Sequence, residues 1–371
     1  MSEEVRKFKI YPNRRRFLKT AASFSGLLLS GCGWTLAEVR PTPTPSINSD
    51  ILYIYSFSTY LDRKLLRRFT AETGIKVVAD VYDSNETMLA KMLAGGGGTY
   101  SVLYPTDYMV CQMLEMGMLT KLNRHRIEGW QNLLPQFHNP SYDPNNSHSV
   151  PIAWGTTGLI YNSKKLKEPP EDWDYLWENQ QLLYRRITLV NDVREVMGAT
   201  LRMLGYSYNS TNPEALQQAY QKLKALKSAI ASFTTDAWRE QLLAGDLLVA
   251  MGYSADAVNV AQKNPDLQYL IPKSGTSVWT DTMAIPKTAP NPDAAYAWIN
   301  FMLKPEVAAF VCDRLNFPTA NQEALKLMSP KTRDNPTLYP PPELLQNCEI
   351  IEPLGKFSEV FDRYWTQLTS S

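Results

Sequence analysis

The sequence predicts an α/β fold with a mostly parallel sheet and helices on its faces. Short apolar runs alternate with segments of helical periodicity near position 50, and the same alternation returns near position 190. A β-α-β-α-β order favours parallel strands, with the connecting helices packed on the sheet. Positions 50–371 are also long enough to bury two separate cores.

The first predicted elements lie just after position 50. Ile51–Phe57 is an apolar and aromatic run that predicts a strand. Tyr60–Thr73 carries apolar residues at helical spacing, and Gly74 marks its end. Ile75–Val81 predicts a second strand. These three elements form the first β-α-β unit.

A second helix and a third strand complete the pattern. Asp83 and Glu86 have the spacing of a capping box ahead of a helix that runs through Leu93. The glycines at 95–98 end this helix, and Ser101–Tyr104 predicts a strand. The glycine run resembles a phosphate loop, but it follows a helix and lacks Gly-Lys-Ser/Thr, so we interpret it as a connection.

The later elements repeat the alternation of strand and helix. We expect strands at Leu189–Val190, Leu247–Met251 and Thr282–Ile285, and helices at Val193–Leu204, Pro213–Ile230, Pro292–Leu303 and Phe357–Leu368.

The N-terminal segment reads as an export signal. Three arginines at 14–16 precede a short apolar stretch and the sequence Leu-Ser-Gly-Cys ending at Cys32. This order is typical of a secretory signal peptide with a twin-arginine-like motif. The final four residues look like a lipobox, in which Cys32 is acylated. We therefore expect a signal peptide at 1–32, a Pro/Thr-rich linker at 33–49, and a periplasmic protein anchored by lipid through Cys32. The alternative is a chance apolar run ahead of a buried cysteine.

Charge and cysteine content exclude several classes of protein. The first 31 residues hold seven of the 38 Lys and Arg and two of the 37 Asp and Glu residues, so their removal leaves a net charge of about −4. No basic tract remains, and we do not expect nucleic acid as a partner. Cys111, Cys312 and Cys348 form no Cys-x-x-Cys pair and are expected to be buried free thiols.

No catalytic or metal-binding motif stands out. The histidines at 125, 138 and 148 lack ligand spacing, and neither His-Glu-x-x-His nor Gly-x-Ser-x-Gly occurs. Asp143-Pro144-Asn145-Asn146 lacks the spaced acids of a calcium loop and is interpreted as a turn. We expect no metal, no cofactor and no enzymatic activity, and instead a protein that binds a ligand.

Five segments carry a resemblance over positions 50–371. They are YSFSTY at 55–60, YDSNETM at 82–88, NDVREV at 191–196, WTDTMAIP at 279–286 and FPTAN at 317–321. In this order the chain resembles the substrate-binding proteins of bacterial polyamine ABC importers, the spermidine/putrescine type. The resemblance implies a two-lobed periplasmic-binding-protein fold of type II. Lobe 1 would comprise 50–154 and 281–325, lobe 2 would comprise 155–280 and 326–371, and the hinge would lie near Gly155 and Thr280.

The ligand of such a protein is an alkyl chain with ammonium groups, which carboxylates and aromatic faces can bind. The resemblance implies acidic ligands at Asp192, Glu195 and Asp281. The rest of the site would comprise Trp279, Tyr60, Tyr108, Tyr253, Phe57, Thr106 and Phe317.

Several positions depart from the spermidine branch of the family. Phe57 and Tyr253 stand where tryptophan is usual, Thr106 replaces a serine and Phe317 replaces a tyrosine. Thr59 and Ile351 replace a glutamate and a glutamine. Asp256, three residues after Tyr253, resembles the putrescine branch and is included in the site. The choice between putrescine and spermidine stays open.

Each candidate also has a structural interpretation. Asp192 could cap the following helix, with Glu195 as its first-turn acid. Trp279 could pack in the core, and Asp256 could be a solvated residue at a helix start. Arg194 is expected to form a structural ion pair.

The resemblance also implies partners. A monomer would deliver its ligand to the membrane permease of an ABC importer. The alternatives are a binding protein for another small cation, a polyamine sensor, or an exported hydrolase that uses Asp192, Glu195 and Asp281 as catalytic acids.

Overall fold

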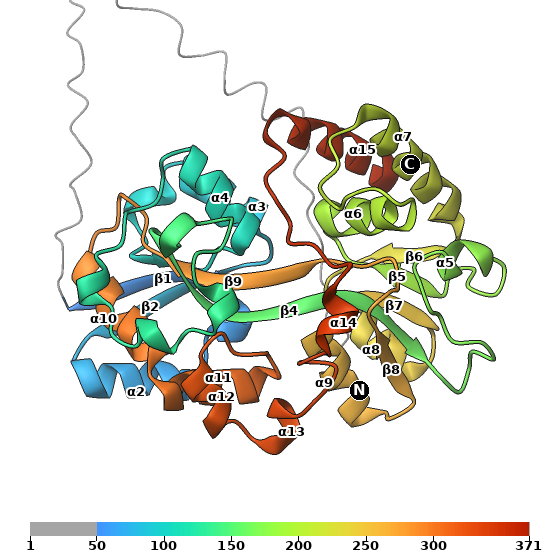
Figure 1. Ribbon diagram of the computed structural model, residues 1–371. Helices are drawn as coiled ribbons and strands as arrows, with labels where there is room; N and C mark the ends of the chain where they lie inside the picture. Colours follow the sequence, from blue (N-terminus) through green and yellow to red (C-terminus); the bar gives the residue numbers. More distant parts are fainter. Residues whose placement is uncertain (1–49, 371) are drawn as a thin grey trace, which may run out of the picture. The chain divides into compact units, whose positions relative to one another are not determined.

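The computed structural model describes residues 50–370 (Figure 1). The expected signal peptide, Cys32 and the linker at 33–49 lie outside the described residues. None of the helices between residues 50 and 370 combines the length and the apolar character that a membrane crossing requires.

Within residues 50–370, nine strands form one sheet in the order β2-β1-β3-β9-β4-β7-β5-β6, and β8 pairs with β4. The strands are β1 (Ile51–Phe57), β2 (Lys76–Tyr82), β3 (Val102–Leu103), β4 (Ser149–Asn162), β5 (Ile187–Leu189), β6 (Ile230–Phe233), β7 (Val249–Tyr253), β8 (Leu267–Leu270) and β9 (Val278–Ala284).

Helices lie on the faces of this sheet (Figure 1). They are α2 (Arg63–Thr73), α3 (Asn85–Leu93), α4 (Asp107–Glu115), α5 (Tyr175–Glu178), α6 (Val193–Met203), α7 (Pro213–Leu226), α8 (Trp238–Ala244), α9 (Ser254–Lys263), α10 (Pro292–Leu303), α11 (Pro305–Leu315), α12 (Gln322–Leu327), α13 (Pro330–Arg333), α14 (Pro342–Leu345) and α15 (Ser358–Ser370).

The two ends of the sheet are parallel and its centre is antiparallel. β1 runs parallel to β2 and β3, and β5 runs parallel to β6 and β7. Between them, β9 pairs antiparallel with β3 and β4, and β4 pairs antiparallel with β7 and β8. The α/β class is as expected, but the sheet is more mixed than expected because β4 and β9 run back between the two parallel ends.

β4 and β9, which we call the crossing strands, join the two ends of the sheet. Residues 149–156 of β4 pair with β9, and residues 157–162 pair with β7 and β8. The register shifts between Pro151 and Ala153, where proline has no N–H to donate to a ladder. In Figure 1 both strands extend between the β1 side and the β7 side, and they run in opposite directions.

Local chemistry explains where the first helices begin. The Asp62 side chain accepts the backbone N–H groups of residues 64 and 65, so α2 starts three residues later than expected. Gly74, with φ of 74°, ends it as predicted. The cap of α3 is Ser84, whose side chain accepts the N–H of Thr87, rather than Asp83.

Other differences lie in the middle of the chain. The helix expected to reach Ile230 ends at Leu226, because Ile230–Phe233 leaves it to pair with β5. The three cysteines among the described residues are free thiols as expected, but only Cys312 is fully buried.

Candidate functional site

Asp281 lies on β9, beside Tyr60 of the short helical turn Ser58–Tyr60. The Tyr60 hydroxyl donates a hydrogen bond of 2.6 Å to Oδ2 of Asp281, and the two side chains are 1% and 7% exposed. No other described residue donates to this carboxylate. Burial raises the pKa of Asp281 to about 6, while the Tyr60 hydrogen bond acts in the opposite direction. Oδ1 is therefore an acceptor without a donor from residues 50–370.

A row of aromatic rings continues from Tyr60. Its ring centroid lies 5.9 Å from that of Phe317, which lies 5.8 Å from Trp279, which lies 5.7 Å from Tyr253. Every pair meets edge to face. Gly155 stands opposite Trp279 on β4, and a Cβ there would come within 2.3 Å of the indole. The Trp279 indole therefore packs directly against the backbone of β4 at Gly155.

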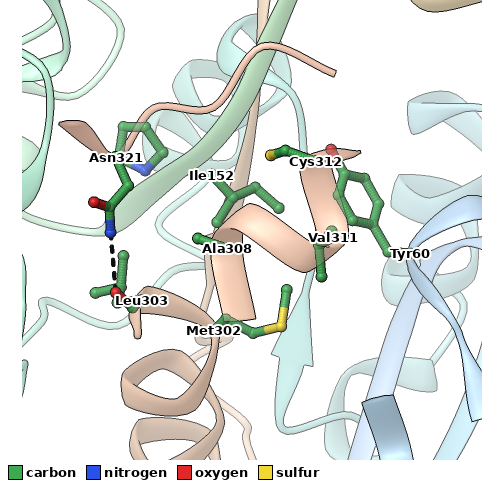
Figure 2. Close-up of a pocket in the computed structure, with 9 residues that line it drawn as sticks. Tyr60, Ile152, Met302, Leu303, Ala308, Val311, Cys312 and Asn321 are labelled. Carbon is green, nitrogen blue, oxygen red and sulfur yellow. Dashed lines mark hydrogen bonds between the residues drawn. The ribbon is translucent and has the colours of Figure 1, made fainter. Parts of the chain in front are cut away.

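Behind Tyr60 lies a small apolar cavity (Figure 2). Asn321 is its polar side chain, and its amide donates a hydrogen bond of 3.0 Å to the carbonyl of Leu303. None of the residues that line this space is acidic, so it offers no carboxylate to a cation. The lining residues are Tyr60, Pro151, Ile152, Met302, Leu303, Ala308, Val311, Cys312 and Asn321.

Asp192 caps α6. Its Oδ1 accepts the backbone N–H groups of Arg194 at 2.8 Å and Glu195 at 3.1 Å, which confirms the capping interpretation. Oδ2 accepts no hydrogen bond from the described chain. Burial raises the pKa of Asp192 to about 7, and the nearby carboxylates of Glu86 and Glu195 add to this effect. Capping therefore uses one oxygen of this carboxylate and leaves the other available.

Glu195 lies in the first turn of α6 and is 3% exposed. Hydroxyl groups of Thr157, Ser277 and Tyr208 donate to its carboxylate. Burial raises its pKa, and these hydrogen bonds oppose that shift. Arg194 does not form the expected ion pair with a carboxylate, because its Nη2 donates to the Asn209 side chain and to a backbone carbonyl.

Thr106 and Tyr108 meet through an asparagine. The amide of Asn85 donates to Oγ1 of Thr106 at 2.9 Å and to the Tyr108 hydroxyl at 3.1 Å. The Tyr108 hydroxyl donates to Oε1 of Glu86 at 2.8 Å. The sequence did not single out Asn85 and Glu86 as candidates, although both lie in the matched segment 82–88.

Asp107 is a third residue that the sequence did not single out. Its fully buried carboxylate accepts the N–H of Tyr108 at 2.8 Å and that of Thr280 at 3.0 Å. Burial holds the pKa of Asp107 well above its usual range. This contact ties α4 to β9 next to Asp281. Its one sequence signal is an acid in the first turn of a helix.

Phe57 and Asp256 have partners outside the row of rings from Tyr60 to Tyr253. The Phe57 ring packs against Tyr82 with centroids 4.5 Å apart. Oδ2 of Asp256 lies 2.8 Å from Nη2 of Arg239, so its charge is already paired. Within the described structure, Tyr60, Asp281, Phe317, Trp279 and Tyr253 form one contact chain, and Asp192 and Glu195 share the start of α6.

Residues 50–370 hold no group of three His, Cys, Asp or Glu side chains that could bind a metal ion. The carboxylate of Asp143 accepts the backbone N–H groups of Ser147, His148 and Ser149. It closes a turn, in agreement with the interpretation of this segment.

A buried carboxylate with an open oxygen beside a row of aromatic rings, and a half-buried one at the start of α6, suit a ligand that combines positive charge with apolar surface. A sheet whose two parallel ends are joined by crossing strands carries these groups. The fold and the site together define a two-lobed solute-binding protein. Residues 64–340 match the model of the bacterial extracellular solute-binding proteins, and the chain belongs to this family.

Relatives share most of their length with this chain. The spermidine/putrescine-binding periplasmic protein of Salmonella typhimurium is 35% identical over 323 residues, which is 86% of this chain and 92% of that protein. The putrescine-binding periplasmic protein SpuD of Pseudomonas aeruginosa is 33% identical and covers 91% of this chain and 96% of its own length.

Solved structures show the same fold. The spermidine/putrescine ABC transporter substrate-binding protein PotD of Streptococcus pneumoniae superposes with a TM-score of 0.75 at 36% identity, over 86% of this chain and 99% of that one. The Tp0655 (TpPotD) lipoprotein of Treponema pallidum gives a TM-score of 0.79 at 28% identity, over 87% of this chain and all of that one.

Proposed function

We propose that this protein captures a polyamine outside the cytoplasm and delivers it to an ABC import permease. The observation that carries this proposal is the open Oδ1 of Asp281 at one end of the row from Tyr60 to Tyr253. Carboxylates would pair with ammonium groups, and the rings would cover the methylenes between them. Relatives named for spermidine and putrescine binding support this ligand class.

Binding would take place between two lobes. We assign 50–154 and 281–325 to lobe 1, and 155–280 and 326–371 to lobe 2. The pairing of residue 154 with 280 and of Gly155 with Trp279 supports a boundary on the crossing strands. Closure around the ligand would bring groups from both lobes together and change the surface that a permease reads.

The remaining parts of the proposal concern location and partners. The protein acts as a monomer, binds its ligand without transforming it, and is anchored through an acylated Cys32 after export. The motif at 29–32 supports the anchor, and a relative of the same fold is described as a lipoprotein. The permease would be the membrane subunits of an ABC importer, driven by an ATPase.

Calorimetric titration of the purified protein tests the proposal. Putrescine and spermidine are the ligands, and butane-1,4-diol is a neutral control of similar length. We expect saturable binding of at least one amine, one per chain, and no binding of the diol. A micromolar dissociation constant corresponds to about −8 kcal/mol. Absence of heat and of thermal stabilisation with both amines would refute polyamine capture.

A further inference from the structure

The C-terminal end of α11 is joined to α9 by hydrogen bonds between side-chain amides. Nδ2 of Asn316, the residue that caps α11, donates to Oδ1 of Asn259 on α9 at 2.6 Å. Nε2 of Gln262, about one turn further along α9, donates to Oδ1 of Asn316 at 3.4 Å. We call these three side chains the amide clasp. Both helices lie on the lower side of the crossing strands in Figure 1.

The backbone at Asn316 indicates that its side chain does more than end the helix. Asn316 has φ of 55° and ψ of 41°, a left-handed conformation that glycine adopts without strain. The cap alone would therefore favour glycine at this position. Asn139 and Asn146, which also have positive φ, use their side chains within one loop. The Asn316 side chain instead bonds to a residue 57 positions away in the sequence.

The clasp is largely shielded from water. Asn316 is 8% exposed, and Asn259 is partly buried. Water therefore competes poorly for the bond between them while α9 and α11 stay together. Once the helices part, both amides can bond to water instead, so the net free energy of breaking the bond is small. A pair of neutral amides can thus slow the separation of the two helices without preventing it.

The same two helices are also linked by the aromatic row. Phe317 follows Asn316 directly, and its ring centroid lies 5.8 Å from that of Trp279. Trp279 in turn lies 5.7 Å from Tyr253, the residue that precedes α9. The clasp and the row therefore connect the end of α11 to the start of α9 twice. Asn316 belongs to the assigned lobe 1 and α9 to lobe 2, so the clasp joins the lobes beside the site.

We propose that the amide clasp holds the two lobes together over the bound ligand and sets how slowly the ligand leaves. This inference rests on the proposed function and adds three positioning residues to it. A ligand enters before the lobes close, so its association should not depend on the clasp. Release requires the lobes to part, and the bond between Asn316 and Asn259 must then break. The clasp should therefore act on the dissociation rate constant rather than on the association rate constant.

Removal of the Asn316 side chain in the full chain provides the test. Asn316→Gly deletes the amide and places at the cap a residue that suits the left-handed conformation. We expect the dissociation rate constant of radiolabelled putrescine or spermidine, chased with excess unlabelled amine, to rise about three- to tenfold. The association rate constant should stay within about twofold of the wild-type value. An unchanged dissociation rate constant in the folded variant would overturn the proposal.

Asn145→Gly is the matched control. Asn145 also has positive φ, of 60°. Its backbone N–H donates to Asn139 and its carbonyl accepts from Arg124, but its side chain bonds to no described residue. Both rate constants of this variant should therefore equal those of the wild-type protein. A faster release from Asn145→Gly, matching that from Asn316→Gly, would assign the effect to the backbone and not to the clasp.

A double-mutant cycle separates a clasp from two independent structural roles. Asn259→Ala removes the acceptor of the short bond and retains a good helix former in α9. If the two side chains act through one bond, the double variant Asn316→Gly/Asn259→Ala should release the amine no faster than the faster single variant. Effects of the single variants that add up in the double variant would overturn the clasp.

Side-chain amide ¹⁵N NMR without ligand reads the clasp independently of binding. Asn259→Ala should shift the Asn316 side-chain resonance, and Gln218→Ala, on the exposed face of α7, should not. An Asn316 resonance that Asn259→Ala leaves unchanged would refute the clasp. If neither amine binds the wild-type protein, the proposed function fails and the control of release fails with it. The NMR result then still decides whether the two helices are joined as described.

Discussion

Asp281 and Glu195 are both buried carboxylates of the candidate site, but their surroundings differ. Asp281 accepts one hydrogen bond, from Tyr60, and faces a row of aromatic rings. Glu195 accepts hydrogen bonds from three hydroxyls. Burial raises the pKa of both groups. The comparison teaches that two acids whose pKa values are both raised by burial can differ in how many internal donors satisfy their oxygens.

The largest effect on this comparison should come from Asp281→Ala. Loss of a charged hydrogen-bond partner should weaken polyamine binding at least tenfold. Calorimetric titration measures the change, and Asp334→Ala is a control because Asp334 is exposed and paired only with Arg333. Unchanged affinity in a folded Asp281→Ala variant would remove this residue from the site.

The second largest effect should be a loss of polyamine affinity at acidic pH, through the carboxylates of Asp281 and Asp192. The pKa values of Asp281 and Asp192 are raised to about 6 and about 7, while the ammonium groups of the ligand stay charged. Affinity should therefore fall at least tenfold between pH 8 and pH 5, as both acids gain protons. Titrations across this range measure the slope, and Asp281→Asn should flatten it. A wild-type affinity that does not change would contradict the assignment.

Asp281 and Asp192 should affect stability in the opposite direction: the free energy of unfolding should fall as the pH rises, whereas ligand affinity should increase. Their pKa values in the folded protein lie above the value of about 4 in an unfolded chain. Their contribution to the free energy of unfolding is present below pH 4 and is lost as the pH rises through 6 to 7. Thermal melts of the ligand-free protein should show that Asp281→Asn raises the melting temperature more at pH 8 than at pH 5.

Gly155→Ala should have a smaller effect. The added methyl group would clash with the Trp279 indole and displace it, at a cost of about 1–3 kcal/mol in unfolding free energy. Affinity should fall several-fold because the aromatic row is broken. Gly98→Ala is the matched control, since a Cβ at Gly98 meets no atom within 4 Å. Equal stability and affinity in the two variants would show that Trp279 does not depend on this seat.

Tyr60→Phe should have the smallest effect. It removes the single internal donor to Asp281 and keeps the ring against Phe317. We expect roughly a threefold loss of affinity at pH 7, since the pKa of Asp281 would rise further and less of it would be ionised. A pH titration of binding should place the midpoint higher than in the wild-type protein. A lower midpoint would mean that another donor replaces Tyr60.

The sequence predicted the parallel ends of the sheet better than its centre. β1 and α10 have the expected bounds, because local periodicity determines them. β4 was missed. Thirteen of its fourteen residues are buried, so its sequence does not alternate between apolar and polar residues. Pro151, Gly155 and Gly158 within it are signals typical of turns. A strand whose two halves pair with different partners cannot be recognised from local pattern.

The site was predicted in part for a similar reason. The matched segments include Tyr60, Trp279 and Asp281, and the structure joins them in one contact chain. The partners of Glu195 could not be predicted, because Tyr208 and Ser277 lie 13 and 82 residues away in the sequence. Asp256 followed the spacing of the putrescine branch, but that spacing does not reveal the neighbouring Arg239.

The Tyr208 hydroxyl that donates to Glu195 has a consequence for the divergence of the family, because a Cβ at Gly198 would come within 2.1 Å of the Tyr208 ring. A relative that keeps this ring over α6 has room only for glycine at the position of Gly198, whereas a relative with a small residue in place of Tyr208 is free of that restriction. The two positions should therefore covary in an alignment. The pair would then act as a sequence marker that sorts relatives by whether they keep this ring, before any ligand is tested.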